Sequence, residues 1–461
     1  MTHFSHAENL SFNRRRFMAA TGSAFAALGA SGCSMASADS RMGAGDVARA
    51  GRTQTGYGAL VSDPDGMLDL PEGFSYRVLS RLGDTMSDGL SVPDKADGMG
   101  CLDLGGGKIA LVRNHELVPG DESGGTLRHG YGTQEGAIVP GGTTTLVLDT
   151  KTLALEKEYR SLAGTIRNCS GGVTPWGSWL TCEEAPTGPG QKYGEGLEQN
   201  HGWVFEVPAG AGRQVDAVPL KAMGRFNHEA ASVDPRTGIV YLTEDRDDSV
   251  FYRFLPAEPG NLAAGGRLQA MAAVDGTTDS RNWPKTDMAS RMRVSAPKQV
   301  RWIDLDNVES PSDDLRTRAA AQGALLIARG EGLHMGEDEL YICSTSGGTA
   351  GLGQVFRFMP GYNGAADRFE LFFESENRDQ FNYGDNLTVA PFGDLFVCED
   401  QYTDVVDNYL RGITPAGQAY AFGRLHRQTE LAGGCFSPDG KWFFVNIYSP
   451  TITVAITGPW T

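Results

Sequence analysis

One cysteine and two adjacent glutamates bracket residues 168–184, a segment whose side chains suit metal binding. Cys169 lies near its start, and Glu183 and Glu184 lie at its end. The Thr-Pro-Trp-Gly sequence between them is typical of a tight turn, so the segment is predicted to form two short strands joined by that turn. Carboxylate oxygens suit calcium, whereas a thiolate favours a softer metal such as iron or zinc. The segment is therefore a candidate metal site.

The outline of this segment recurs along the chain. In each copy a polar and usually acidic residue opens a short apolar strand, and a turn and a second apolar strand follow. Third and fourth strands follow in most copies, and units of about 40 to 50 residues with four strands are the sequence pattern of a β-propeller. The copies run over residues 97–116, 168–183, 229–244, 331–346, 385–400 and 430–446. We therefore predict an all-β fold, a six-bladed β-propeller with short helical insertions.

The sixth unit lacks a fourth strand of its own. Residues 74–82 alternate apolar and polar side chains and are predicted to supply it, so that an N-terminal strand closes the last blade and leaves no open edge. Fourth strands of the second and third units are predicted at residues 215–221 and 300–305. Residues 257–298 are interpreted as an irregular insertion, and residues 312–328 as a helix with two acids near its start, where they favour the helix dipole.

The first strand of every propeller blade lines the central channel, so the residues that open the six units should converge. They are Asp97, Asn168 with Cys169 beside it, Glu229, Glu331, Asp385 and Glu430. A single acid at a strand start is more often a solvated cap, but repeated placement favours a shared cavity. Converging carboxylates repel each other, and they take up protons or bind cations.

Other candidate ligands are scarce. Among the eight histidines, His115 and His228 are the best placed, and both are interpreted as core or supporting groups, so a histidine-rich zinc site is not expected. The other cysteines after the N-terminal segment are predicted to be small buried apolar residues; they are Cys101, Cys182, Cys343, Cys398 and Cys435.

Composition excludes several classes of function. The formal net charge is −17, which argues against a nucleic-acid groove because such grooves need basic patches. The chain has 61 glycines, and its glycine-rich runs coincide with predicted turns; no nucleotide-binding glycine loop or serine nucleophile elbow is present. An anionic substrate would need bound cations or a few arginines to neutralise the site locally.

The N-terminal residues resemble a twin-arginine export signal. Arg14, Arg15 and Arg16 precede Phe17, and a weakly apolar run over residues 19–28 follows. Cleavage after Ala38 would define a signal peptide at residues 1–38, a linker at 39–70 and a catalytic propeller at 71–461. A loose lipobox ending at Cys33 is the rival, and only lipidation there would place the protein on a membrane. We expect a periplasmic or extracellular monomer whose partner in export is the twin-arginine machinery.

Several segments resemble the PhoX family of alkaline phosphatases, which are secreted β-propeller enzymes. The resemblance covers about residues 70–455, and its most specific motif is the segment from Asn168 to Glu184. It is also carried by 114–116, 224–229, 242–245, 329–331, 437–440 and 444–446. The resemblance implies a phosphomonoesterase that uses iron with calcium and acts on a small phosphate ester.

The resemblance also implies roles for individual residues. Cys169 would be the thiolate ligand of iron, Glu244 and Glu331 would be carboxylate ligands, and Arg329 would bind the phosphate. The residues implied as further ligands, chiefly of calcium, are Glu116, Glu183, Glu184, Glu229, Asp385, Glu399 and Asp400.

The chain departs from better-known members of that family. It is shorter, with smaller loops, and it has Thr243-Glu244-Asp245 where a Gly-Asp-Asp sequence is associated with the family. These changes put the substrate range and the identity of the metals in question. Two alternatives therefore stay open: a calcium-dependent lactonase or esterase propeller, and a non-catalytic, calcium-stabilised propeller that binds a partner.

Overall fold

The computed structural model describes residues 55–461 apart from residue 193 and residues 402–406. The predicted export signal, both processing sites and the linker up to residue 54 lie outside the described residues. Within them the regular secondary structure is almost entirely β; the helical elements are α3 (Leu315–Ala321) and the short 3-10 turns η2 (Lys221–Met223), η3 (Leu262–Ala264) and η4 (Met288–Ser290). None of the described helices is long and apolar enough to cross a membrane.

Antiparallel sheets account for the fold, and each sequence unit supplies one run of neighbouring strands. The first unit has β4 (Ala96–Gly105), β5 (Lys108–His115), β8 (Gly141–Asp149) and β9 (Leu155–Thr165), and the second has β10 (Asn168–Val173), β11 (Ser178–Glu183) and β12 (Val204–Pro208). The third has β13 (His228–Val233), β14 (Val240–Glu244), β16 (Tyr252–Pro256), β17 (Gly266–Ala273) and β18 (Lys298–Asp304). The fourth has β20 (Gly330–Met335), β21 (Leu340–Ser344), β22 (Gln354–Met359) and β23 (Arg368–Glu374), and β18 pairs with β23 to join these two units in one sheet.

The two remaining units combine C-terminal and N-terminal strands. The fifth has β24 (Gly384–Val389), β25 (Leu395–Glu399), β26 (Tyr409–Ile413) and β27 (Ala419–Leu425), extended by β2 (Leu68–Pro71) and β1 (Leu60–Val61). The sixth has β28 (Leu431–Phe436), β29 (Phe443–Ile447), β30 (Ile452–Thr457) and β3 (Ser75–Arg81). Two short ribbons complete the fold: β6 (Thr133–Gln134) with β7 (Ala137–Ile138), and β15 (Ser249–Val250) with β19 (Leu326–Ile327).

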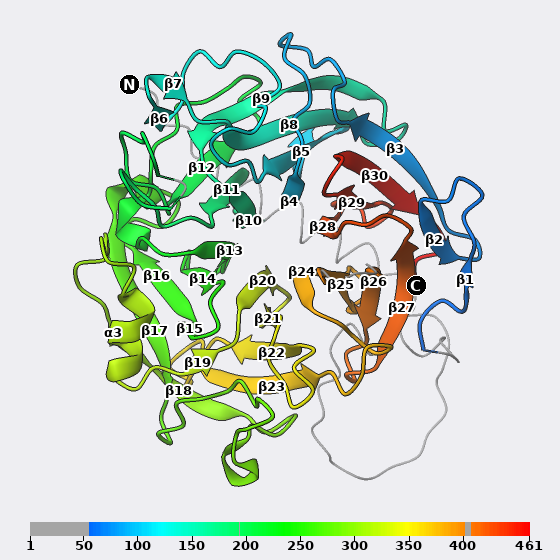
Figure 1. The fold of residues 1–461 in the computed structure, drawn as a ribbon. Coiled ribbons are helices and arrows are strands. Elements are labelled where there is room, and N and C mark those ends of the chain that lie inside the picture. The colour runs from blue at the N-terminus through cyan, green and yellow to red at the C-terminus, as the bar shows by residue number, and fades with distance from the viewer. Residues whose placement is uncertain (1–54, 193, 402–406) are drawn as a thin grey trace. The chain divides into compact units, whose positions relative to one another are not determined.

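The units form a propeller-like ring. The first strands of the units are β4, β10, β13, β20, β24 and β28, and each contacts the next in that order, with β28 returning to β4. Figure 1 shows these strands closest to the middle of the ring and the later strands of each unit farther out. The prediction that the opening strands lie innermost is therefore confirmed.

Each innermost strand is irregular near its start. The pairing register between first and second strand shifts just after the opening residues, for example between Asn168 and Gly171 in β10 and between Gly330 and Leu333 in β20. The same shift occurs in β4, β13, β24 and β28. Such bulges leave residues out of the regular ladder and re-aim their side chains. The repeated bulge lies where the sequence places its candidate ligands.

The N-terminal strand closes the last unit as predicted. β3 pairs with β30 in antiparallel register. A buried ion pair of the first unit contacts this strand pair. Arg113 on β5 donates to Glu158 on β9 at 2.9 Å, and Ser80 on β3 donates to the same carboxylate oxygen at 2.8 Å. Arg113 also donates to Thr453 on β30 at 2.6 Å. The first and last units are thus joined by a charged network.

The predicted linker is wrong for residues 60–70. β1 and β2 pair with each other, and β2 pairs with β27, so this segment belongs to a sheet. Its polar turn is held by Asp63, whose carboxylate accepts the backbone N–H groups of Met67 and Leu68 and the hydroxyl of Tyr76 at 2.6 Å. The turn-forming residues of this segment therefore connect two paired strands and do not form a linker.

Three predictions for the middle of the chain are also wrong. The helix predicted over residues 312–328 ends at Ala321 because Gly323 adopts a left-handed φ of 88°, and residues 326–327 then form β19. The segment 257–298 contains β17, so residues 298–304 form a fifth strand of the third unit. Residues 215–221 form no strand, and β12 ends its sheet.

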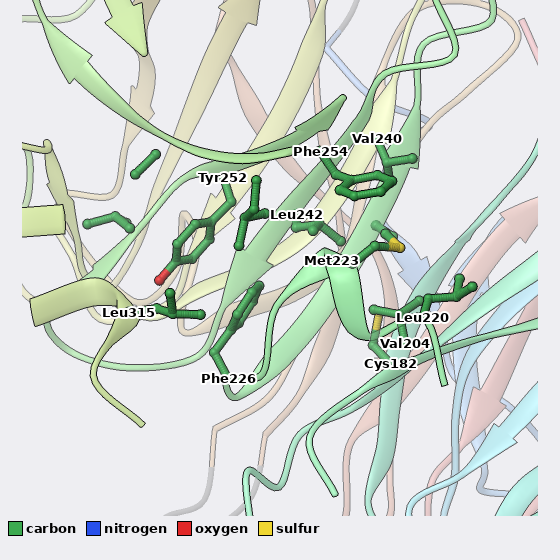
Figure 2. Close-up of a cluster of buried hydrophobic side chains, with 14 of the residues drawn as sticks. Cys182, Val204, Leu220, Met223, Phe226, Val240, Leu242, Tyr252, Phe254 and Leu315 are labelled. Atoms are coloured by element: carbon green, nitrogen blue, oxygen red, sulfur yellow. The ribbon is translucent and has the colours of Figure 1, made fainter. Parts of the chain in front are cut away.

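Apolar side chains fill the space between neighbouring units. Figure 2 shows the cluster between the second and third units, whose members include Cys182, Val204, Met223 and Val240. Cys182, Cys343 and Cys398 are all buried in apolar clusters, as predicted, and Cys101 and Cys435 are half-buried against another.

We predict that Glu158→Ala lowers the free energy of unfolding by about 3–5 kcal/mol, because it leaves the Arg113 guanidinium buried without its carboxylate. Guanidinium chloride titration measures this. The matched control is Glu156→Ala on the same strand, which removes an exposed pair with Lys108 and should cost less than about 1 kcal/mol. Equal losses in the two variants would contradict the role of the buried pair.

Candidate functional site

Five innermost strands deliver their second residue to one cavity. These residues are Asp97, Cys169, Glu229, Glu331 and Asp385; the corresponding residue of β28 is Ala432. The cavity has a volume of about 430 Å³, and the bulge that follows each of these residues explains why all five face the same space. Glu430, directly before β28, also lines it. The predicted convergence is confirmed.

A second set of cavity residues directly follows the second strand of each unit. It contains Glu116, Glu184, Asp245, Asp400 and Tyr448. The backbone N–H of each donates to the carbonyl of the residue before the first strand of its own unit, at N···O distances between 2.8 and 3.2 Å. Thr345 of the fourth unit makes the same bond to Arg329. This repeated bond fixes both strand ends at the cavity.

Three cations line the cavity from the position before a first strand. Lys95, Arg167 and Arg329 have left-handed φ angles of 55°, 48° and 50°, a conformation that non-glycine residues adopt rarely and that recurs at functional sites. Arg329 donates to Asp245 at 2.8 and 3.1 Å and to Glu331 at 2.8 Å. Arg167 pairs in the same way with two acids of the first and second units.

Candidate ligand atoms gather in three groups. Glu116, Cys169 and Glu184 form one, Glu229, Glu331 and Asp385 another, and Asp385, Asp400 and Glu430 the third; within each group the ligand atoms lie within 4.8 Å of one another. The first group holds the thiol, whose Sγ also lies 3.5 Å from Asp97. The other two offer only oxygen. Such donor sets suit a soft metal in the first group and calcium in the others.

Unpartnered oxygens show that the site fits cations. Both carboxylate oxygens of Glu229 and Oδ1 of Asp97 are buried with no hydrogen-bond partner among the described residues. Buried polar atoms are nearly always paired, and an unpaired carboxylate in a low-dielectric site is costly. Cations bound between these groups would remove that cost.

Burial and mutual repulsion raise the pKa values of the cavity acids. Burial, followed by the charge of Asp400, raises the pKa of Asp385 to about 7, and burial raises the pKa of Glu184 to about 8 although Arg167 opposes it. The pKa values of Asp97, Glu229, Glu331 and Glu430 lie well above their usual range for the same reasons. A metal-free cavity therefore holds protons that a cation must displace.

Three predicted ligands lie outside the cavity. Glu183, Glu244 and Glu399 are each the last residue of a second strand, and each is buried with its own partners. Glu183 accepts from Ile166, His201, Gly202 and Trp203; Glu399 accepts from Asn382, Tyr409 and Arg411; Glu244 accepts from Tyr252 and Arg316. These carboxylates hold loops and neighbouring strands in place.

The reason is the alternation of side chains at a strand end. In each adjacent pair the second acid faces the cavity and the first faces away, which separates Glu184 from Glu183, Asp245 from Glu244 and Asp400 from Glu399. Asp245, which the sequence does not single out as a ligand, is thus a cavity residue. His115 and His228 do not line the cavity; each bonds to a backbone carbonyl, of Asp94 and Gly224 respectively.

Sequence reasoning also missed Lys95 and Arg167. Both carry a readable signal: a cation stands two residues before the inner ligand in Lys95-Ala96-Asp97, Arg167-Asn168-Cys169 and Arg329-Gly330-Glu331. The family resemblance points only to Arg329 among these three cations. Tyr448, which donates to Glu116 at 2.6 Å, offers no comparable signal.

Comparison with known protein families identifies the family of this chain. The profile of alkaline phosphatase PhoX matches residues 55–153 and 139–451. The chain belongs to the alkaline phosphatase PhoX family. A search of curated proteins finds no match.

Three solved structures are similar to this chain, and the first of them supports the propeller-like fold. The structure of Pseudomonas fluorescens PhoX in complex with vanadate, a transition state analogue, is similar with a TM-score of 0.63 and 19% identity, covering 85% of this chain and 96% of that one. A gluconolactonase from Xanthomonas campestris has a TM-score of 0.40 and 16% identity, covering 88% and 98%. The periplasmic gluconolactonase of Pseudomonas aeruginosa has a TM-score of 0.38 and 14% identity, covering 81% and 88%.

We predict that the metal-free protein loses stability as pH rises from about 6.5 to about 8. Acids whose folded pKa is raised bind more protons in the folded state than in the unfolded state, so stability falls until the pH passes the folded pKa, which is about 7 for Asp385 and about 8 for Glu184. His228 and His334, whose pKa values burial lowers to about 3 and about 4, act in the opposite direction only at lower pH.

Urea unfolding in the presence of a chelator, repeated between about pH 6.5 and about pH 8, measures this. The midpoint should fall with pH in chelator and fall less when iron and calcium are supplied. A midpoint that stays constant or rises in chelator would contradict the assignment of buried, mutually repelling acids.

Proposed function

We propose that this chain is a metal-dependent phosphatase that hydrolyses phosphate monoesters in the central cavity of a six-bladed propeller. Family membership and the similarity to a PhoX structure bound to vanadate support phosphoryl chemistry. The main observation behind the proposal is that three groups of candidate ligands and Arg329 line one cavity of about 430 Å³.

The charge of the cavity links metal binding to the substrate. Nine carboxylates face three cations: Asp97, Glu116, Glu184, Glu229, Asp245, Glu331, Asp385, Asp400 and Glu430 against Lys95, Arg167 and Arg329. Such a lining repels a phosphate ester until bound cations reverse the local field. The same acids are the groups that would hold those cations.

We propose iron beside Cys169, held with Glu116 and Glu184, and calcium at the oxygen-only groups formed by Glu229, Glu331, Asp385, Asp400 and Glu430. Bound cations supply positive charge and Lewis acidity to a phosphoryl group and its leaving oxygen. The thiol pKa of Cys169 is raised by burial and neighbouring acids, so this residue needs a metal to act as a thiolate. Glu183, Glu244 and Glu399 are not part of this proposal.

Arg329 is the proposed phosphate-binding residue. Its guanidinium donates two hydrogen bonds to Asp245 and a third to Glu331. These bonds fix the planar group at the cavity, while part of the side chain stays exposed. These bonds use Nε and Nη2 and leave the two N–H groups of Nη1 for phosphate oxygens. Because the guanidinium is already fixed, binding there costs little side-chain entropy. Phosphoryl transfer depends chiefly on such positioning and charge neutralisation.

The proposal extends to export. The twin-arginine sequence supports transport of folded protein to the periplasm or beyond, with lipidation at Cys33 as the route to a membrane. The calcium-dependent lactonase remains an alternative from sequence, and the lactonase structures with TM-scores of 0.40 and 0.38 add nothing to it. An assay of purified protein with p-nitrophenyl phosphate and with a gluconolactone separates the two activities.

We predict that Cys169→Ala loses iron and hydrolyses p-nitrophenyl phosphate at least about a hundredfold more slowly, because the softest ligand and a fixed point of the site are removed together. Elemental analysis and steady-state kinetics on the same preparation measure both effects. Cys101→Ala, which alters a half-buried cysteine outside the cavity, is the control and should match the parent protein. Full activity without iron would remove the thiolate from the mechanism.

We predict that Arg329→Ala raises the inhibition constant of inorganic phosphate by about 10- to 100-fold with metals retained, as expected for losing a charged two-pronged contact. Arg329→Lys keeps the charge but not the fork and should recover only part of the loss. Arg318→Ala, which removes an arginine paired with Asp306 away from the cavity, should leave phosphate inhibition unchanged. Unchanged inhibition in Arg329→Ala would end this assignment.

A further inference from the structure

The bulges of the innermost strands are held from the neighbouring unit. Because a bulge interrupts the ladder, the carbonyl of its first residue needs another donor. In three units that donor is a buried side chain: Asn114 donates to the Cys169 carbonyl at 2.9 Å, Thr243 to the Glu331 carbonyl at 2.6 Å, and Asn446 to the Asp97 carbonyl at 2.6 Å. Each acceptor belongs to a residue that lines the cavity.

The three donors occupy the same place in their units. Asn114, Thr243 and Asn446 are the penultimate residues of β5, β14 and β29, and each reaches the innermost strand of the next unit round the ring. The penultimate residues of the other second strands are Cys182, Cys343 and Cys398, which are buried in apolar clusters. The thiol-containing ligand group thus lies where the first unit supplies an amide, that of Asn114, to the second unit.

Asn114 is the most fully bonded of the donors. Its amide nitrogen also donates to the carbonyl of Ser170 at 2.8 Å, and its oxygen accepts from Trp179 at 2.9 Å and Thr181 at 2.8 Å. All of these partners belong to the second unit, and Asn114 is completely buried. Its amide group therefore has one orientation, fixed by four bonds to the hairpin that carries Cys169.

Close packing leaves the bulge no other position. A Cβ atom at Gly98 would lie 2.7 Å from the Cys169 carbonyl, so the first unit touches that peptide from a second side. The direction of the Cys169 side chain follows from the peptide planes on either side of its Cα atom. Anchoring the carbonyls of Cys169 and Ser170 together fixes the direction of the Cys169 Cα–Cβ bond, on which the position of Sγ depends.

We propose that Asn114 is a positioning residue that aims the thiol of Cys169 at Glu116 and Glu184, acting across the boundary between two units. This proposal rests on the proposed metal site for its consequence in catalysis, but the geometry it describes is a property of the metal-free chain. Asn446 holds Asp97 in the equivalent way and provides a matched comparison.

The test compares Asn114→Leu with Asn446→Leu, two substitutions of similar size that each remove one inter-unit amide. The metal-free proteins are treated with iodoacetamide, and the labelling rate of Cys169 is followed by peptide mass spectrometry. We expect Asn114→Leu to change that rate at least about threefold and to weaken iron binding about tenfold, as loss of a supporting hydrogen bond does at metal sites. Asn446→Leu reaches the thiol only through Asp97, whose Oδ2 lies 3.5 Å from Sγ, and should change the Cys169 labelling rate less than Asn114→Leu does.

Equal effects of the two variants on Cys169 labelling, or no effect of either, would overturn the proposal. If either Leu variant fails to fold, Trp179→Phe and Thr453→Val replace the pair, because each removes one donor to the oxygen of Asn114 or Asn446. Trp179→Phe should then shift Cys169 labelling more than Thr453→Val does, and an equal shift would overturn the proposal. Because labelling needs neither metal nor substrate, failure of the phosphatase assignment would not alter this result.

Discussion

Mutual repulsion among buried carboxylates is the constraint on which the rest of this structure depends. Burial alone raises the pKa values of these acids, and their neighbours raise several of them further. No apolar packing can remove this cost, because the groups are fixed by strands that the ring holds together. The cavity is stable only when protons or cations share it, and this requirement connects the fold to its chemistry.

The ring meets this constraint by repeating one local design. In each unit the residue before the first strand is hydrogen-bonded to the residue after the second strand. A bulge near the start of the first strand directs the side chain of its second residue into the cavity. Cations occupy the first of these positions in three units, and acids occupy the other in four. Because neighbouring units contact each other around the closed ring, the ligand positions of one unit depend on the side chains of the unit before it.

Much of this arrangement could be predicted from the sequence. The repeated outline located all six innermost strands, the closing strand β3 and the convergence of Asp97, Cys169, Glu229, Glu331 and Asp385. Such a repeat can be recognised in a single sequence because every copy contains both the apolar strands and the polar residue that precedes them. The family resemblance added Arg329, which the bulge and its left-handed conformation bring to the cavity.

Other features depend on contacts that a single sequence does not display. Adjacent residues of a strand face opposite sides, so the choice between Glu183 and Glu184, or between Glu399 and Asp400, requires the end of the strand to be known to within one residue. The sheet position of residues 60–70 comes from pairing with β27, more than three hundred residues later in the chain. The bonds of Asn114 likewise join two units, so neither local pattern nor composition reveals them.

The most direct measurement is a crystal structure of protein purified with its native metals, with anomalous diffraction recorded on both sides of the iron absorption edge. An iron peak within bonding distance of the Cys169 Sγ atom, accompanied by oxygen-bound calcium at Glu229, Glu331 and Asp385, is the predicted result. A cavity without metal in which these acids form hydrogen bonds with each other, or iron bound elsewhere on the protein, would contradict the central claim that repelling carboxylates exist here to hold cations.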